Sequence, residues 1–239
     1  MKPICMIGRG GLKPLIRAFQ ARNVEAIISQ TRQPGYFNVG WGWSGGDVNR
    51  HIPPNKLWEL QQMQQARLRI VPLVETYEDA MKLWRAGKTL YQRNTNHQCG
   101  TDVKLVGKDI GLPVEHHYGF WTVAVPRRKE FRVHVWNGTA FRSGIKINKE
   151  TGQPNKPDGV PVWNEETGWV LSYGREVPTE AKRLAEKATK ACVLDFSGVD
   201  IIESVDGDFY LLETNTAPGL GPETAAAYAE QIITAAKER

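Results

Sequence analysis

The sequence predicts an α+β fold with an α/β-type N-terminal portion. Two dipeptides, Asp206-Gly207 and Asn137-Gly138, separate strand-like runs and favour hairpins. Residues 131–136 alternate apolar and polar side chains, which is typical of a half-buried strand. Helical periodicity interrupts the strand-like runs in four segments: 56–67, 77–84, 179–192 and 225–237. Hairpins mixed with helices indicate the α+β class for most of the chain.

The first residues have the pattern of a β-turn-α-β unit. Residues 3–8 are an apolar run that predicts a buried strand, residues 12–22 an amphipathic helix and residues 24–28 a second strand. This beginning resembles a Rossmann-like unit, but Gly10-Gly11 is far too little for a dinucleotide fingerprint. We therefore expect a structural glycine turn there.

Residues 33–50 are rich in glycine and aromatic side chains, and predict an irregular connection. Within them, Trp41-Gly42-Trp43 either stacks on a base or sugar or packs as a plug against the next domain. The residues leave both readings open.

Composition limits the classes of function. The chain has 239 residues, of which 41% are hydrophobic and 24% charged, and this is ordinary for a globular protein. Its net charge of +5 suits anionic ligands such as nucleotides, but no block of five basic residues makes a case for nucleic acid. No apolar run reaches the length of a membrane span, and no signal-type segment follows Met1. A soluble, cytoplasmic protein is expected.

The three cysteines, Cys5, Cys99 and Cys192, are odd in number and widely spaced. This argues against a disulfide framework and against a zinc knuckle.

A pair of acids marks the most informative stretch. If Asp206 and Gly207 are the two central turn residues, Asp200 lies opposite Glu213, and alternation puts both acids on one face. That face also carries five other side chains: Ile202, Ser204, Phe209, Leu211 and Asn215. Opposed carboxylates roughly 5 Å apart destabilise a sheet, so either one is protonated or a cation lies between them. Mg²⁺ fits two carboxylates and the Asn215 carbonyl. A longer turn would instead separate the acids and leave them solvated at a sheet edge.

The string GVDII, a short hairpin and YLLETNTAPGLGPET resemble the last motif of the ATP-grasp superfamily, which includes D-alanine–D-alanine ligases and ribosomal-protein glutamate ligases. The resemblance implies a fold in which two α+β subdomains clasp ATP. It implies that Asp200, Glu213 and Asn215 hold the magnesium of Mg-ATP. It also implies that Pro218 and Gly219 form part of the pocket for the second substrate.

Earlier segments match the family more weakly and supply the remaining ATP contacts. Lys56 matches a lysine that binds phosphate. Arg93 stands where a second lysine is usual, so a planar guanidinium replaces a compact ammonium group while the charge is kept. Loop 94–102, with His97 and Gly100, resembles the loop that covers the β- and γ-phosphates. The strand end formed by Val123, Ala124 and Val125 resembles the hinge whose backbone reads adenine.

Three basic residues are the catalytic candidates that the resemblance implies. Arg132 matches a residue that binds the transferred phosphate or an acyl phosphate, although the charged outer face of an edge strand would look the same. Arg142 and Lys146 project toward the cleft or toward solvent, and strand parity cannot choose between these. Asn164 resembles a substrate-side position. Gly198 departs from the family, in which an arginine often precedes the aspartate by two residues.

The resemblance divides the chain at residues 54 and 125. Residues 1–54 form an abbreviated N-terminal domain, residues 55–125 the first ATP-grasp subdomain and residues 126–239 the second, with the metal site. The implied activity is ATP- and Mg²⁺-dependent formation of an amide through an acyl phosphate, with a small-molecule, peptide or protein carboxylate and an amine as partners. The alternatives are an inactive protein that binds Mg-ATP and a protein that interacts with nucleic acid.

Overall fold

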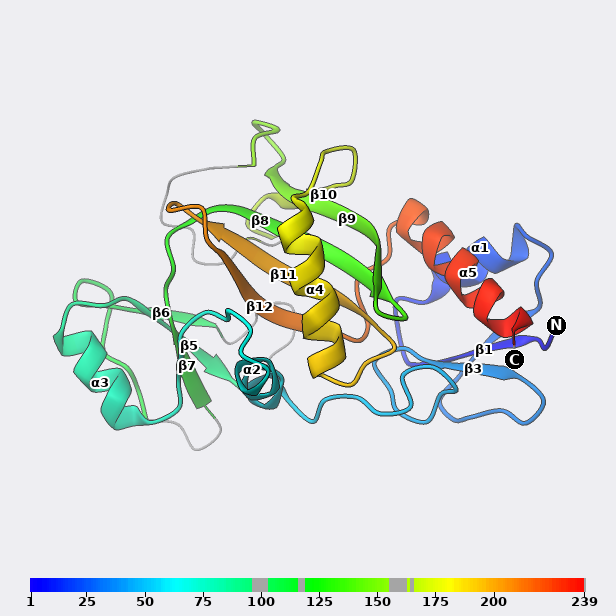
Figure 1. The fold of residues 1–239 in the computed structure, drawn as a ribbon, viewed down its shortest axis with the longest axis horizontal. Coiled ribbons are helices and arrows are strands. Elements are labelled where there is room, and N and C mark those ends of the chain that lie inside the picture. Colours follow the sequence, from blue (N-terminus) through cyan, green and yellow to red (C-terminus); the bar gives the residue numbers. More distant parts are fainter. Residues whose placement is uncertain (96–102, 116–118, 155–162, 164–165, 239) are drawn as a thin grey trace.

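A computed structural model describes residues 1–95, 103–115, 119–154, 163 and 166–238. The described chain forms three sheets that follow one another along the long axis of the molecule (Figure 1). Their strand orders are β2-β1-β3, β10-β9-β8-β11-β12 and β4-β7-β5-β6. None of the helices in these residues is long and apolar enough to cross a bilayer.

The N-terminal sheet is parallel. Its elements are β1 (Ile4–Ile7), α1 (Lys13–Gln20), β2 (Ala26–Ser29) and β3 (Phe37–Gly40). Strand β1 pairs with β2 on one side and β3 on the other. Helix α5 (Pro222–Lys237), from the other end of the chain, lies beside α1 and shares the core of this sheet. The strand, helix and strand expected from the first residues are confirmed.

The interpretation of residues 33–50 as irregular throughout is wrong, because β3 lies within them. Phe37 and Val39 are buried in the N-terminal core, where a short parallel strand covered on both faces leaves no alternation to detect. Trp41 is the packing plug, since its ring stacks on Phe196 at 5.1 Å and meets Tyr228 edge-on at 4.9 Å. Gly40 is needed there, because a Cβ would lie 2.2 Å from the Trp43 carbonyl oxygen.

The four-stranded sheet is antiparallel and carries α3 on one face. Its elements are α2 (Lys56–Gln65), β4 (Leu73–Val74), α3 (Tyr77–Arg85), β5 (Leu90–Asn94), β6 (Lys104–Val106) and β7 (Gly119–Val123). Both helices begin at a capping side chain: Asn55 accepts from the Trp58 N–H and Thr76 from the Asp79 N–H. Helix α2 lies on the other side of this sheet and packs against the central core.

The central sheet is also antiparallel. Its elements are β8 (Arg127–Trp136), β9 (Thr139–Asn148), β10 (Trp169–Ser172), α4 (Thr179–Ala191), β11 (Phe196–Ser204) and β12 (Phe209–Asn215). Strand β8 lies between β9 and β11, so it is not an edge strand. Apolar side chains of one face, such as Val133 and Ile201, pack against α4 and α2. Across the pairing, Arg132 and Asp200 stand together on the opposite face.

The turn between β11 and β12 differs from the expected two-residue turn. The Ser204 N–H donates to the Asp208 oxygen at 2.8 Å, so the loop has three residues, Val205–Gly207. This loop shifts the register by one residue, and a bulge at Leu212 shifts it back. Asp200 therefore does lie opposite Glu213.

The bulge corrects one further expectation. Because it switches the side on which the strand's residues point, Phe209 and Leu211 face the core together with Ile201, and not the side of Glu213. Of the three apolar side chains expected beside the two acids, only Ile202 remains on their face, which is mainly polar and is called the polar face below.

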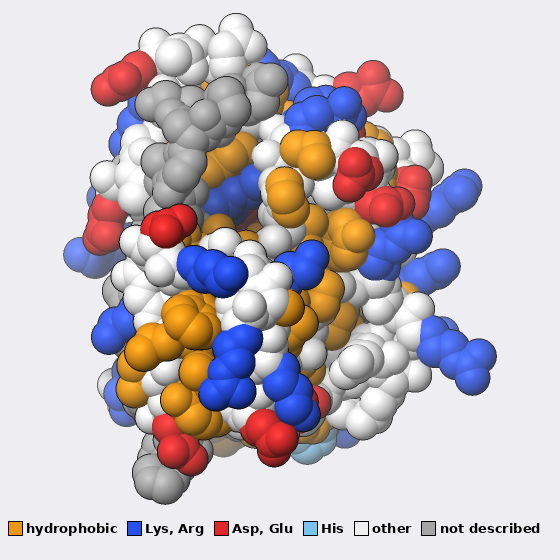
Figure 2. Space-filling model, turned by 90° about the vertical axis from the view of Figure 1, so that its left-hand side faces the viewer, with side chains coloured by type: hydrophobic (Ala, Val, Ile, Leu, Met, Phe, Trp, Pro, Cys, Tyr) orange, Lys and Arg blue, Asp and Glu red, His pale blue; other side chains and the backbone are white. Residues whose placement is uncertain are grey.

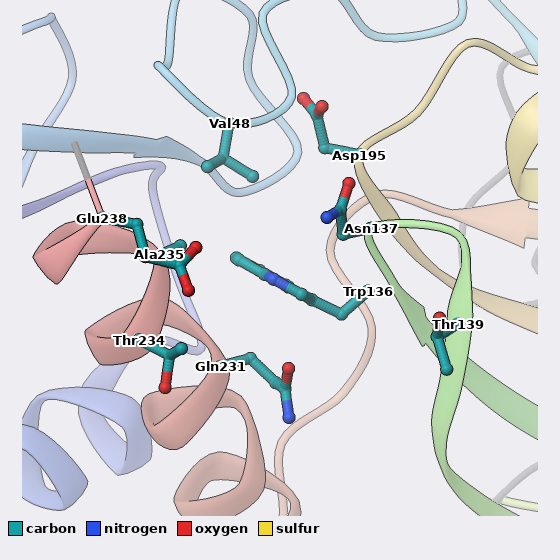
Figure 3. A pocket seen from close by; sticks show the side chains of 9 residues that line it. All are labelled: Val48, Trp136, Asn137, Thr139, Asp195, Gln231, Thr234, Ala235 and Glu238. Carbon is teal, nitrogen blue, oxygen red and sulfur yellow. The ribbon is translucent and has the colours of Figure 1, made fainter.

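A pocket of about 450 Å³ lies where the N-terminal portion meets the β8–β9 turn and the end of α5 (Figure 3). Its lining residues are Val48, Trp136, Asn137, Thr139, Asp195, Gln231, Thr234, Ala235 and Glu238. None of the predicted site residues lines it.

Candidate active site

The predicted metal ligands lie together on the polar face of the central sheet. Asp200 is 4% exposed and faces Glu213 across β11 and β12. The Asn215 side chain bridges them, since its Nδ2 donates to Asp200 Oδ2 at 3.4 Å and to Glu213 Oε1 at 3.1 Å. The Asn215 side chain thus lies within hydrogen-bonding distance of both acids.

Two basic side chains offset the charge of this acid pair. Arg132 Nε and Nη2 donate to the two Asp200 oxygens at 2.7 and 2.6 Å, as a bidentate ion pair. Lys56 Nζ lies 3.8 Å from Glu213 Oε2 and donates to the Thr214 oxygen at 2.6 Å. Burial alone would lower the pKa of both cations, but the neighbouring carboxylates raise them above their ordinary values. Both groups are therefore charged at neutral pH.

The donor set suits a hard divalent cation. Two carboxylates and one amide oxygen offer the ligands that Mg²⁺ prefers, and the Asn215 amide can turn its oxygen toward them. The described residues hold no group of three or more His, Cys, Asp or Glu side chains suited to a metal. Mg²⁺ commonly takes only one or two carboxylates and completes its octahedron with phosphate oxygens and water.

Arg93 supplies a separate sign of an anionic ligand. Its Nε is buried, and no partner for it exists among the described residues. Burial lowers the pKa of Arg93, while the negative charges of Glu213 and Glu59 oppose that effect. A buried guanidinium N–H without an acceptor is costly, and a phosphate oxygen would satisfy it. Viewed from the β4–β7 end, the surface is hollowed and Lys and Arg side chains lie within the hollow (Figure 2).

Glu59 belongs to the site and was missed by the sequence analysis. It is 5% exposed, its carboxylate lies 3.3 Å from Lys56 Nζ, and it accepts from the Thr214 N–H at 3.0 Å. Glu59 therefore fixes Lys56 against the strand that carries Glu213. The available signal was its spacing of three residues after Lys56 on a helix, which places the two side chains together.

The adenine candidates lie where β7 passes into β8. The Val123 N–H donates to the Pro72 oxygen and the Ala124 N–H to the Thr89 oxygen, both at 2.9 Å. These two donors are therefore used inside the four-stranded sheet. Val125 lies in the connection that joins this sheet to the central sheet, and its place at a hinge that reads adenine stays a prediction.

Arg142 and Lys146 both share the polar face but make different contacts. Arg142 donates to Thr224 Oγ1 at 3.2 Å and to Glu223 Oε2 at 2.8 Å, at the start of α5. Lys146 pairs with Glu130 and donates to the Trp163 oxygen at 2.5 Å. Both cations are thus anchored by partners outside the acid pair.

Pro218 packs directly on Gly198. A Cβ on Gly198 would lie 2.8 Å from the Pro218 Cβ, which explains why no side chain stands at this departure from the family pattern. A Cβ added to Gly219 would meet no heavy atom of the described residues within 4 Å, its two chain neighbours apart. The Gly42 N–H, in the N-terminal portion, donates to the Thr216 oxygen at 3.0 Å. The segment after β12 that carries Pro218 and Gly219 therefore also contacts the first 54 residues.

Replacing Gly198 by Ala is expected to lower the free energy of unfolding by about 1–3 kcal/mol, because the added methyl overlaps Pro218. Urea unfolding measures this. The control is Gly10→Ala, where no atom of the described residues beyond the chain neighbours lies within 4 Å of the added methyl. Equal stability of the two variants would show that Pro218 does not rest on Gly198.

His134 lies at the centre of a buried aromatic group on the same face. It is fully buried, and its Nδ1 lies 3.0 Å from Tyr228 Oη and its Nε2 3.1 Å from Tyr173 Oη. Burial, with smaller contributions from Arg132 and Arg142, lowers the pKa of His134 to about 3. The imidazole is therefore neutral throughout the physiological range.

This lowered pKa predicts a loss of stability in acid. His134 binds a proton near pH 6.5 in the unfolded chain but only near pH 3 in the folded protein. Its contribution to the free energy of unfolding is therefore present above pH 6.5 and is lost as the pH falls toward 3. Between these two pH values the free energy of unfolding changes by about 1.4 kcal/mol per pH unit. Urea unfolding gives the free energy of unfolding at pH 7 and at pH 4.5. Between these pH values it should fall less for His134→Gln than for the wild type or for the exposed control His51→Gln. The same difference in all three would contradict the assignment.

Three predicted residues, His97, Gly100 and Asn164, lie outside the described residues. Their roles stay predictions.

No protein-family model matches the sequence. Similar solved structures nevertheless cover nearly the whole chain. The ATP-grasp ligase PsnB, complexed with a phosphomimetic variant of its minimal precursor, Mg and ADP, is 12% identical over 97% of both chains, with a TM-score of 0.69. D-alanine–D-alanine ligase from Bacillus anthracis is 12% identical over 100% of this chain and 98% of its own, with a TM-score of 0.66.

A RiPP-associated ATP-grasp ligase from Chryseobacterium gregarium, in complex with ADP and a leader and core peptide, is 11% identical. It covers 99% of this chain and 98% of its own, with a TM-score of 0.63. These likenesses extend through all three sheets, and they confirm the predicted fold class. The chain has the ATP-grasp fold.

Proposed function

We propose that this protein is an ATP-dependent carboxylate–amine ligase that works through an acyl phosphate. The observation that carries the proposal is the contact group of Asp200, Glu213 and Asn215, with Arg132 and Lys56 set against it. A fold by itself does not fix an activity. Here the acids and cations that phosphoryl transfer needs occur together on one face of that fold.

The residues of the site divide into metal ligands and phosphate-binding cations. Asp200, Glu213 and the Asn215 oxygen would hold Mg²⁺, which supplies positive charge to the phosphates and orients them. Lys56 and Arg93 would bind phosphate oxygens. Lys56 is held in place by Glu59, and Arg93 has a buried donor to offer.

The reaction has two displacements. A carboxylate oxygen of the first substrate attacks the γ-phosphorus, and the bond to ADP breaks. The amine of the second substrate then attacks the acyl carbon, inorganic phosphate leaves, and the amine gives up a proton. Arg132, whose two donors bind Asp200 in this structure, would move from that carboxylate to the transferred phosphoryl group. Positioning and charge neutralisation do most of the work in such transfers.

The substrates are a carboxylate and an amine, either free or carried on a peptide or protein. Solved structures of the same fold include ligases with bound precursor peptides, which supports a peptide as one candidate. We further propose the division into residues 1–54, 55–125 and 126–239, with the last two regions contributing to the ATP site.

The direct test is ADP formation in the presence of ATP, Mg²⁺ and mixtures of amino acids and short peptides. We expect ADP only when a carboxylate substrate is present, and a product whose mass equals the two substrates minus one water. ADP formation with no dependence on any added carboxylate would contradict a ligase. A matching product with AMP and pyrophosphate in place of ADP would contradict the acyl phosphate.

A further inference from the structure

Three rings form a chain of hydrogen bonds on the polar face of the central sheet. Tyr228 and His134 are both fully buried, whereas Tyr173 is partly exposed. The Tyr228 hydroxyl bonds to His134 Nδ1 and the Tyr173 hydroxyl to His134 Nε2. The rings come from α5, β8 and the segment just after β10.

The burial of Tyr228 fixes the direction of these bonds. A neutral imidazole carries one N–H and one lone pair, so it accepts from one tyrosine and donates to the other. His134 Nδ1 is the only partner of the Tyr228 hydroxyl among the described residues. A buried hydroxyl that could not donate would cost free energy, so Tyr228 donates to Nδ1. The proton of His134 is then on Nε2, and Nε2 donates to the Tyr173 oxygen.

This arrangement leaves the Tyr173 proton available. Its oxygen already accepts from His134, and no acceptor for its O–H exists in the part of the chain that the structure describes. Each bond in such a chain polarises the next, which makes the terminal hydroxyl a better donor.

The position of Tyr173 tells which ligand would accept. Its ring lies over Gly144, where a Cβ would come within 2.9 Å of it, and Gly144 pairs across the sheet with Arg132. The Arg142 guanidinium lies 4.0 Å from the centre of the same ring. Tyr173 thus lies against Arg142 and over the residue that pairs with Arg132, and the ligand that suits a free hydroxyl donor beside cations is an anion.

We propose that Tyr173 is a substrate-contacting residue that donates its phenolic hydrogen to an oxygen of the phosphoryl group transferred beside Arg132. His134 and Tyr228 are positioning residues that orient this donor. The inference rests on the proposed function, because it takes the ligand to be that phosphoryl group. The competing explanation is that Tyr173 only packs against Gly144 and Arg142.

The test uses Mg-ADP with aluminium fluoride, a mimic of the transferred phosphoryl group. Calorimetry gives the affinity for Mg-ADP, and then the affinity for aluminium fluoride at saturating Mg-ADP. We expect Tyr173→Phe to weaken aluminium fluoride binding about 10-fold, as for a lost hydrogen bond to a charged group, and to leave Mg-ADP binding unchanged. Tyr36→Phe, whose hydroxyl bonds Glu25 in the N-terminal portion, is the matched control.

A double-mutant cycle separates donation from packing. Tyr228→Phe should weaken aluminium fluoride binding by a smaller factor, because His134 can then turn its lone pair toward Tyr173. The double variant should bind it no more weakly than Tyr173→Phe alone. Unchanged binding in Tyr173→Phe, additive effects, or no aluminium fluoride binding to a wild type that binds Mg-ADP would each overturn the inference. Failure of the wild type to bind Mg-ADP would instead overturn the proposed function.

Discussion

Replacing Glu213 by Gln is expected to lower the rate of ADP formation by about 100-fold or more. The substitution keeps the shape of the side chain but removes one of the two carboxylates that face each other across β11 and β12. It also removes the charge opposite Lys56. Electrostatic contributions of this kind supply several kcal/mol to phosphoryl transfer. The rate is measured at several Mg²⁺ concentrations, and the variant should need more metal to reach its lower maximum.

The matched control is Asp208→Asn. Asp208 is an acid of the same hairpin, pairs with Arg69 near the turn and is about half exposed. Loss of the Asp208 charge should leave the rate of ADP formation within about twofold of the wild-type rate, since exposed ion pairs contribute little to stability. If Glu213→Gln and Asp208→Asn formed ADP equally fast, the acid pair would have no part in the reaction.

The Arg132→Gln variant should be less stable by roughly 3–5 kcal/mol, because it leaves the Asp200 carboxylate buried without its bidentate partner. The two groups lie on adjacent strands within the central sheet and are both largely buried. Urea unfolding, with Mg²⁺ absent, gives the change in the free energy of unfolding.

Adding Asp200→Asn to this variant should recover most of the loss, since the uncompensated charge is then gone. The double variant should remain inactive, because it lacks a metal ligand and a phosphate-binding cation together. If Arg132→Gln were as stable as the wild type, or if Asp200→Asn made it less stable still, the buried ion pair would be refuted.

How far the sequence predicts this site is clearest at the β11–β12 hairpin. Two-residue spacing placed Asp200 opposite Glu213, and the structure agrees, although the turn has three residues. The pairing was right because the bulge at Leu212 compensates for the longer loop. The local sequence gives no sign of that bulge, so strict alternation along the strand put Phe209 and Leu211 on the wrong face.

Partners from distant segments are what the sequence does not predict. Alternation placed Arg132 and His134 on one face of β8, but it could not show that Arg132 pairs with Asp200 or that His134 bonds to Tyr173 and Tyr228. Those contacts depend on which strands neighbour β8 and on how α5 folds back over the sheet. The short strand β3 was not predicted for a related reason, because it is recognised only by its pairing with β1.

The measurement that tests the account most directly is calorimetric titration of ATP into the wild-type protein, with Mg²⁺ and with the metal chelated. The arrangement of Asp200, Glu213, Asn215, Lys56 and Arg93 predicts one ATP bound per chain, with an affinity at least tenfold greater when Mg²⁺ is present. No binding under either condition, or binding of equal strength with and without the metal, would contradict the assignment of this face as a Mg-ATP site.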